Sequence, residues 1–167
     1  MSFSLTKYFN ILEQILADRG CPWSKEQTIS TICHYVIEEA YEVLDAEKKG
    51  DGKKVQEELG DLYFTVTFLS RLILDQYKGS FEEMGEKGCD KRVRRSPHVF
   101  ENPKQVTLEE LRGQWEAQKA KERKEHKESP MKSIAPSLPL IIRTMKWVEL
   151  AHKYGYQEEL SSESLGD

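Results

Sequence analysis

Apolar residues recur along the chain at intervals of three and four positions, which is the spacing of amphipathic helices. Glycine, proline and small polar residues separate the periodic segments, and such residues end helices and form turns. No segment has the convincing alternation of a strand, and residues 20–23 are expected to form a loop. The pattern predicts an all-α helical bundle, with helices at about residues 5–19, 28–49, 53–77, 81–95, 107–128 and 140–154.

The second and third of these helices are joined by a Gly-Asp-Gly turn at residues 50–52, which predicts an antiparallel helix hairpin. On the helix after the turn, the residues expected to face inward are Leu59, Leu62, Val66, Leu69 and Ile73. The same helix offers more apolar surface than one domain of this size needs to bury. The residues that indicate this surplus are Phe64, Phe68, Leu72 and Ile73. We therefore expect the hairpin to keep a further apolar face that must be covered.

Two acidic clusters flank the turn, and each places two carboxylates three residues apart. Residues at this spacing lie on one face of a helix, one turn apart. Glu42 and Glu58 lie at comparable distances from the turn, and so do Glu39 and Asp61. If the two helices fold against each other, Glu42 faces Glu58 and Glu39 faces Asp61. Four carboxylates are then expected to meet at one level of the hairpin.

Bare carboxylates in such an arrangement repel one another, and their pKa values rise. A hard divalent cation relieves the repulsion, and Mg²⁺ is the usual choice where phosphate oxygens share the site. The plainer interpretation is solvated helix surface, because the chain has 29 acidic residues and chance pairs are common. Two pairs in register, each embedded in apolar sequence, favour the metal site. A di-iron centre is disfavoured because these helices lack the Glu-x-x-His motif.

Cations that could hold phosphate charge occur at helical spacing elsewhere in the chain. Lys54 lies one turn before Glu58 on the same helix. Lys91 and Arg95 are four residues apart, and so are Trp115 and Lys119, so the two members of each pair could bind one ligand together. Each pair alone fits solvated surface, and Trp115 fits an amphipathic core position equally well.

Composition narrows the classes of protein. A chain of 167 residues predicts one domain, its net charge of −4 argues against nucleic-acid binding, and no apolar run is long enough to span a membrane. The N-terminal residues lack the basic start and apolar core of a signal peptide. Cys21, Cys33 and Cys89 have no disulfide spacing, which predicts free thiols in a reducing cytoplasm. A zinc site built from these cysteines and His34 is disfavoured because no Cys-x-x-Cys pair is present.

Six motifs, in order, resemble those of the MazG family of nucleoside triphosphate pyrophosphohydrolases. They are CPWSKEQT (21–28), EEAYEVLDA (38–46), EELGDLYF (57–64), RRSPHVF (94–100), WEAQKAKE (115–122) and SLPLIIRTMK (137–146). The motifs cover nearly the whole chain, and their order is far more specific than any one of them. The resemblance implies an all-α fold shared with dimeric dUTPases and phosphoribosyl-ATP pyrophosphohydrolase.

The same resemblance implies hydrolysis of a nucleoside triphosphate between the α and β phosphates, giving a monophosphate and pyrophosphate. It implies Mg²⁺, with Mn²⁺ as a substitute, held by Glu39, Glu42, Glu58 and Asp61. Glu38 is then a base or orients another group, and either role remains open. The positions that match nucleotide contacts of the family are Lys54, Lys91, Arg95, Trp115 and Lys119. Trp23 is interpreted either as a second stacking residue for the base or as a structural residue that pins its loop.

The resemblance further implies a homodimer with a four-helix core, and stacking on the base would suit broad house-cleaning of nucleotides. Residues 1–128 are expected to form the catalytic domain, with residues 129–167 as the linker, helix and flexible tail of the same unit. Ser96 stands where a histidine is common in the family, and Gly85 and Gly88 weaken the helix before it. The alternatives are a catalytically silent nucleotide-binding regulatory module and a purely structural helical interaction protein.

Overall fold

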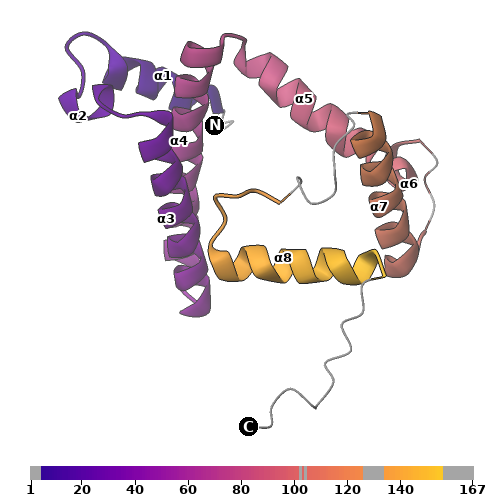
Figure 1. Ribbon diagram of the computed structural model, residues 1–167. Coiled ribbons are helices and arrows are strands. Elements are labelled where there is room, and N and C mark those ends of the chain that lie inside the picture. Colours follow the sequence, from indigo (N-terminus) through magenta and orange to yellow (C-terminus); the bar gives the residue numbers. More distant parts are fainter. Residues whose placement is uncertain (1–4, 102, 104, 126–133, 156–167) are drawn as a thin grey trace. The chain divides into compact units, whose positions relative to one another are not determined.

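The computed structural model describes residues 5–101, 103, 105–125 and 134–155, and these residues contain no strand. The all-α prediction is therefore confirmed for the described part of the chain. The helices are α1 (Leu5–Leu16), α2 (Pro22–Lys25), α3 (Ile29–Lys48), α4 (Gly52–Tyr77), α5 (Phe81–Arg94), α6 (Pro97–Phe100), α7 (Leu108–Glu125) and α8 (Leu140–Lys153) (Figure 1). Two compact units divide the chain, residues 1–90 and residues 91–167.

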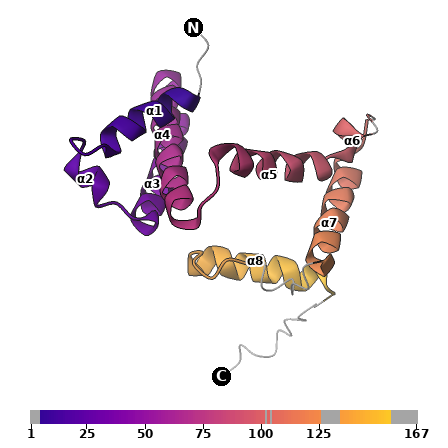
Figure 2. The same cartoon turned by 90° about the horizontal axis from the view of Figure 1, so that it is seen from above.

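The hairpin of α3 and α4 is the centre of the first unit, and the two helices run side by side in both ribbon views (Figures 1 and 2). Thr28 caps α3, since its hydroxyl accepts a hydrogen bond from the Thr31 backbone N–H at 3.2 Å. Gly50 has a φ of 71° in the turn, a conformation that glycine adopts without strain. The Asp51 carboxylate then accepts hydrogen bonds from two backbone N–H groups of α4. These caps fix where each helix starts and therefore the register of the hairpin.

The core of the first unit lies where α1 packs on the hairpin. Leu12, Ile32 and Phe68 are its buried residues, one from each of α1, α3 and α4. The half-buried residues that pack against them are Leu16, Val36, Phe64, Leu69 and Leu72. Phe64, Phe68 and Leu72 are thus used within the unit itself, so the prediction that they form a surplus apolar face was wrong. α1 covers them, and periodicity along α4 does not reveal that partner.

A different set of apolar side chains is left exposed on the hairpin. Leu59 and Val66, which were expected to face inward, are 38% and 42% exposed, so that part of the prediction was wrong. They are among what we call the outer apolar residues, which are Ile37, Tyr41 and Leu44 on α3 and Leu59, Tyr63 and Val66 on α4. Each helix of the hairpin therefore carries exposed apolar residues besides those that pack in the core with α1.

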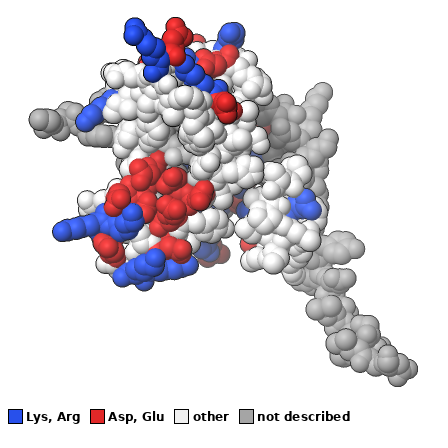
Figure 3. Space-filling model, turned by 90° about the vertical axis from the view of Figure 1, so that its left-hand side faces the viewer, with Lys and Arg blue, Asp and Glu red and all other residues white. Residues whose placement is uncertain are grey.

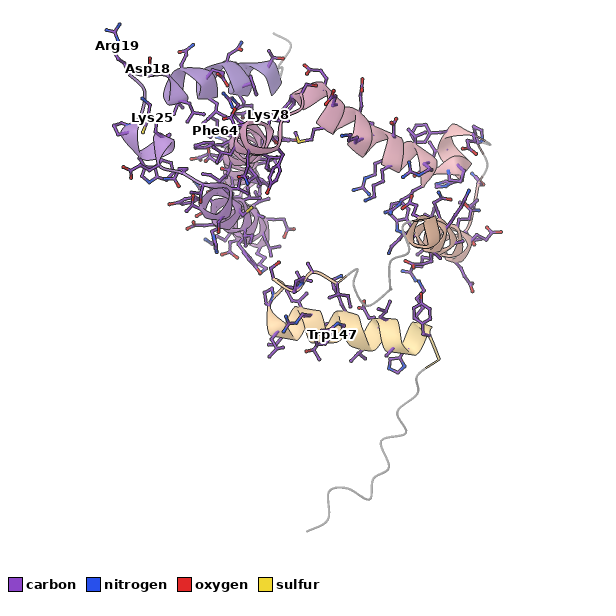
Figure 4. All side chains as sticks on the ribbon, turned by 45° about the horizontal axis from the view of Figure 1, so that its top comes forward. Asp18, Arg19, Lys25, Phe64, Lys78 and Trp147 are labelled. Carbon is purple, nitrogen blue, oxygen red and sulfur yellow. The ribbon has the colours of Figure 1, made fainter. Side chains whose placement is uncertain are left out.

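The connection from α1 to α3 is more ordered than the expected loop. α1 ends at Leu16 rather than Arg19, and residues 22–25 form the short helix α2. A Cβ at Gly20 would lie 2.0 Å from the carbonyl oxygen of Ile15, so only glycine fits this tight turn. The Lys25 ammonium donates a hydrogen bond to the backbone carbonyl of Asp18 at 2.5 Å, and both residues are labelled in Figure 4.

The second unit begins near the end of α5 and contains α6, α7 and α8. α5 is continuous through Gly85 and Gly88, whereas the short helix α6 was not predicted. Thr107 and Glu110 cap α7 by exchanging hydrogen bonds between their side chains and backbone N–H groups. In α8 the Arg143 guanidinium lies over the ring of Trp147, which Figure 4 labels, at 5.2 Å from the ring centroid.

Some expectations fall outside the described residues, namely the end of the helix predicted to reach residue 128, the linker after it and the flexible tail. The division at residues 128 and 129 therefore stays a prediction. None of the helices described here has both the length and the apolar content that crossing a bilayer requires.

Candidate metal centre

The hairpin brings carboxylates from both of its helices together. One oxygen of each of Glu39, Glu58 and Asp61 lies within 4.8 Å of the others, a separation that one metal ion can bridge. Glu39 comes from α3, while Glu58 and Asp61 are one turn apart on α4. Figure 3 shows acidic side chains gathered densely on the side of the molecule that carries the hairpin. The predicted meeting of acids across the turn is therefore present for these three residues.

Glu42 lies beside this group rather than within it. Its carboxyl group is exposed, and it interacts with Glu58 through a hydrogen bond and through charge repulsion. Desolvation, followed by the charges of Glu58 and Glu38, raises the pKa of Glu42. Glu42 thus faces Glu58 as predicted, at the outer edge of the cluster. Glu38 is close enough for its charge to act on both Glu39 and Glu42.

The negative charge of the carboxylate cluster exceeds the positive charge of the side chains that contact it. Glu58 is buried, with 6% of its surface exposed. Partial burial raises the pKa of Glu39, and the charges of Glu42, Asp61 and Glu58 raise it further. Lys54 contacts the cluster, with its ammonium 2.8 Å from Glu58 and 3.1 Å from Glu57. These hydrogen bonds raise the pKa of Lys54, so it remains a cation, yet one lysine leaves the repulsion among the acids in place.

The donor set fits a hard divalent cation. All candidate ligands are carboxylate oxygens from two helices, and oxygen ligands of this kind suit Mg²⁺ or Mn²⁺. The raised pKa values of Glu39 and Glu42 indicate that the site lacks positive charge, which a bound cation would supply. The three cysteines are free, and the His34 ring is hydrogen-bonded to the backbone carbonyl of Ser30. The zinc alternative gains no support from these contacts.

Arg95, one of the predicted phosphate contacts, already interacts with other side chains of the second unit. The Arg95 guanidinium forms an ion pair with Glu122, and both side chains are mostly buried, at 13% and 14% exposure. The same guanidinium lies 5.3 Å from the centroid of the Trp115 ring. Hydrogen bonds from Arg95, and then from Arg94, lower the pKa of Glu122 to about 2. Glu122 therefore fixes the orientation of Arg95 and compensates its charge, a role that sequence analysis missed.

The remaining predicted contacts are more exposed. The Lys119 ammonium lies 3.0 Å from the carboxylate of Glu116 on the preceding turn of α7. Lys91 is exposed, and its backbone carbonyl accepts a hydrogen bond from the Arg95 N–H. Trp23 is half exposed and packs edge-on against Tyr35, with 5.6 Å between ring centroids. Both interpretations of Trp23 stay open, because it has a structural neighbour and an open surface.

Helical spacing could have found one of the partners that sequence analysis missed. Glu116 lies three residues before Lys119, with which it forms an ion pair on the same helix. Pairs on different elements, such as Arg95 with Glu122, leave no such signal because the separation of 27 residues depends on how the chain folds.

The described part of the chain is therefore all-α and carries, on a helix hairpin, a cluster of carboxylates suited to a divalent cation. Residues 27–100 match the family model of the MazG nucleotide pyrophosphohydrolase domain, which includes all of the clustered acids. The chain belongs to the MazG family.

Two curated relatives and one solved structure are similar to the chain. The nucleoside triphosphate pyrophosphohydrolase of Escherichia coli (strain K12) is 38% identical over 130 residues, which are 77% of this chain and 49% of the relative. The nucleoside triphosphate pyrophosphohydrolase/pyrophosphatase MazG of Thermotoga maritima is 29% identical over 147 residues, 88% of this chain and 56% of the relative. This chain therefore spans about half the length of the curated relatives it matches.

The crystal structure of a mazG-related protein from Thermotoga maritima gives the structural comparison. It has a TM-score of 0.62 and 29% sequence identity, and the match covers 69% of this chain and 98% of that protein. The likeness supports the MazG-like all-α fold.

Proposed function

We propose that this chain is a Mg²⁺-dependent nucleoside triphosphate pyrophosphohydrolase. It would cleave the bond between the α and β phosphates and release a nucleoside monophosphate and pyrophosphate. The observation that carries the proposal is the cluster of Glu39, Glu58 and Asp61, whose oxygens lie within 4.8 Å of one another and whose negative charge Lys54 offsets only in part. The names of the relatives from Escherichia coli and Thermotoga maritima support the same activity.

In this proposal the metal is held by Glu39, Glu42, Glu58 and Asp61. Bound Mg²⁺ would neutralise phosphate charge and lower the pKa of a water molecule. Glu38, whose charge acts on Glu39 and Glu42, would accept the proton of that water or orient a ligand. The Lys54 ammonium, which is paired with Glu58, would add positive charge next to the phosphates.

The proposed nucleotide contacts are Lys54, Lys91, Arg95, Trp115 and Lys119, with Trp23 as a further candidate for stacking. Arg95 would bind phosphate in the orientation that Glu122 gives it. Stacking on tryptophan tolerates any base, which supports a broad house-cleaning role over recognition of one nucleotide.

We also propose that the chain works as a homodimer in the cytoplasm. The outer apolar residues of the hairpin are suited to contact with a second hairpin, since exposed apolar surface is stabilised by burial. Free Cys21, Cys33 and Cys89 suit a reducing compartment. Light scattering should give a mass near twice 19.4 kDa, and a monomer would contradict the dimer.

The test is pyrophosphate release from standard and modified nucleoside and deoxynucleoside triphosphates, with and without Mg²⁺. Wild type is compared with Glu42→Gln, which removes one proposed ligand charge, and with Glu47→Gln as the matched control. Glu47 lies on the same helix and is exposed, so the control carries the same change of charge outside the cluster. We expect turnover that requires metal, is lost in Glu42→Gln and is retained in Glu47→Gln.

Two outcomes would change the conclusion. No pyrophosphate from any nucleotide, with nucleotide binding intact, would assign the chain to the regulatory module instead. Turnover that survives both metal removal and Glu42→Gln would exclude the carboxylate cluster as the catalytic site. The panel itself ranks substrates, and strong preference for one base would reject the house-cleaning role.

A further inference from the structure

A second charged site lies within the second unit, between α7 and α8. A cavity of about 550 Å³ opens there, and residues 134–138 before α8 complete its wall. Its charged lining residues are Arg112, Glu116 and Lys119 from α7 and Lys146, Glu149 and Lys153 from α8. The lining thus has four cations and two anions, an excess of two positive charges in a chain whose net charge is −4.

Glu116, one of the two acids in the pocket, is hydrogen-bonded to two of its four cations. Glu116 accepts hydrogen bonds from Lys119, at 3.0 Å, and from Lys153. The bond from Lys153 is the main reason that the pKa of Glu116 is lowered. Glu116 therefore stays ionised and holds an ammonium group from each helix at the pocket wall.

The other cations of the pocket are not engaged in this way. Among the residues that the structure describes, Arg112 and Lys146 form no ion pair, although both line the cavity. An arginine fork matches the geometry of phosphate oxygens, and lysine adds a point charge. Ile134, Leu138 and Leu150 supply apolar parts of the wall, while Arg112 and Lys146 are themselves exposed and therefore accessible to an anion from solvent.

The size of the cavity narrows the class of ligand. Small-molecule sites have volumes of about 300–1,000 Å³, and this pocket lies in that range. It is larger than a single phosphate ion needs, so it would accommodate pyrophosphate or the phosphates of a nucleotide with part of the sugar. A ligand with one anionic oxygen or none would leave Arg112, Lys146 or both without an anionic partner.

We propose that the pocket between α7 and α8 binds a polyphosphate group, supplied by pyrophosphate or by a nucleotide, through Arg112 and Lys146. Lys119 and Lys153, held by Glu116, provide the opposite wall. The proposal shares Lys119 with the proposed nucleotide contacts and rests on the proposed function for the choice of a phosphate-bearing ligand. It does not require hydrolysis, because a silent nucleotide-binding module would use the same pocket.

The test is calorimetric titration of the full chain with inorganic pyrophosphate in the presence of EDTA. Without metal, the carboxylates of the hairpin repel phosphate, so binding reports on the cationic pocket. Arg112→Gln and Lys146→Gln should each weaken binding about tenfold, since each removes a charge-assisted hydrogen bond. Lys121→Gln is the matched control, because Lys121 is exposed on α7 and does not line the pocket. Arg112→Lys, which keeps the charge, should recover part of the affinity.

A parallel titration with a nucleoside triphosphate, again without metal, identifies the source of the phosphates. If Arg112→Gln and Lys146→Gln weaken the binding of pyrophosphate and of the nucleotide equally, the pocket recognises the phosphate chain alone. If they weaken the binding of the nucleotide more, the pocket is a nucleotide site. Absence of metal-free binding of either ligand, or equal weakening by Lys121→Gln, would overturn the proposal. The titrations measure binding and not turnover. Their result can therefore be interpreted even if the chain proves not to be a hydrolase.

Discussion

Glu39 in the hairpin and Glu122 in the second unit are both partly buried glutamates, yet their pKa values are shifted in opposite directions. Burial and neighbouring carboxylates raise the pKa of Glu39, whereas hydrogen bonds from Arg95 and Arg94 lower that of Glu122 to about 2. The first acid is surrounded by like charges and the second by opposite charges. The difference distinguishes a site that lacks a cation from a contact that is complete within the unit.

The same contrast extends to packing. The hairpin has a buried apolar core at Leu12, Ile32 and Phe68, while no described residue of α7 or α8 is fully buried. Helix backbones fix the acids of the hairpin, but ion pairs between long side chains shape the second unit. Substitutions in the two units should therefore differ in their effects on stability and on activity.

Phe68→Ala should lower the free energy of unfolding by about 3–5 kcal/mol, because it leaves a cavity in the core under α1. Val148→Ala, at a half-exposed position of α8, should change it by less than about 0.5 kcal/mol. Urea denaturation followed by circular dichroism measures both. Similar losses for the two variants would show that packing does not separate the regions.

Asp61→Asn should reduce turnover by at least about a hundredfold, because it removes a charge that the proposed metal and transition state require. Asp45→Asn is the control, since Asp45 is exposed on α3 and pairs only loosely with Lys48. Steady-state kinetics and titration with Mg²⁺ would be measured together. Loss of activity with unchanged metal affinity would remove Asp61 from the ligand set.

Glu122→Gln should destabilise the protein by about 1–3 kcal/mol at neutral pH, because it leaves the mostly buried Arg95 guanidinium without its anion. The folded pKa of Glu122, about 2, lies below its ordinary value of 4.5. The stabilisation is therefore present above pH 4.5 and is lost as the pH falls toward 2. Denaturation across this window should show the two proteins converging in acid.

Glu109→Gln is the control for that variant, because Glu109 is exposed in the first turn of α7. It should have little effect at any pH. A difference between wild type and Glu122→Gln that persists unchanged at the acid end would contradict the ionic origin of the stabilisation.

The smallest effect expected is a pH dependence of the metal-free protein. The pKa values of Glu39 and Glu42 are raised, so these acids bind protons more readily in the folded state. Stability, measured as Tm, should therefore increase as the pH falls toward 4.5, the ordinary pKa of these acids. Excess Mg²⁺ should remove or reverse the trend, since the metal competes with protons. Thermal scans with and without metal decide the point, and no effect of Mg²⁺ would contradict the metal site.

Much of the hairpin could be predicted from the sequence because its determinants are local. The Gly-Asp-Gly turn and the helical period place Glu39, Glu58 and Asp61 on facing sides of two helices. The same period could not tell which apolar side of α4 would be covered. Leu59 and Val66 were assigned to the interior, although Phe64 and Phe68 meet α1 instead.

Local sequence was enough to predict the six longer helices, the turn between α3 and α4 and the facing positions of the acids, because each depends on residues only a few positions apart. Tertiary structure decided which apolar face is buried, that Glu122 compensates Arg95, and that cations of α7 and α8 line one pocket. These contacts join residues far apart in the chain, and their geometry depends on how whole helices pack. Helical periodicity records the faces of one helix, but it does not record the partner of each face.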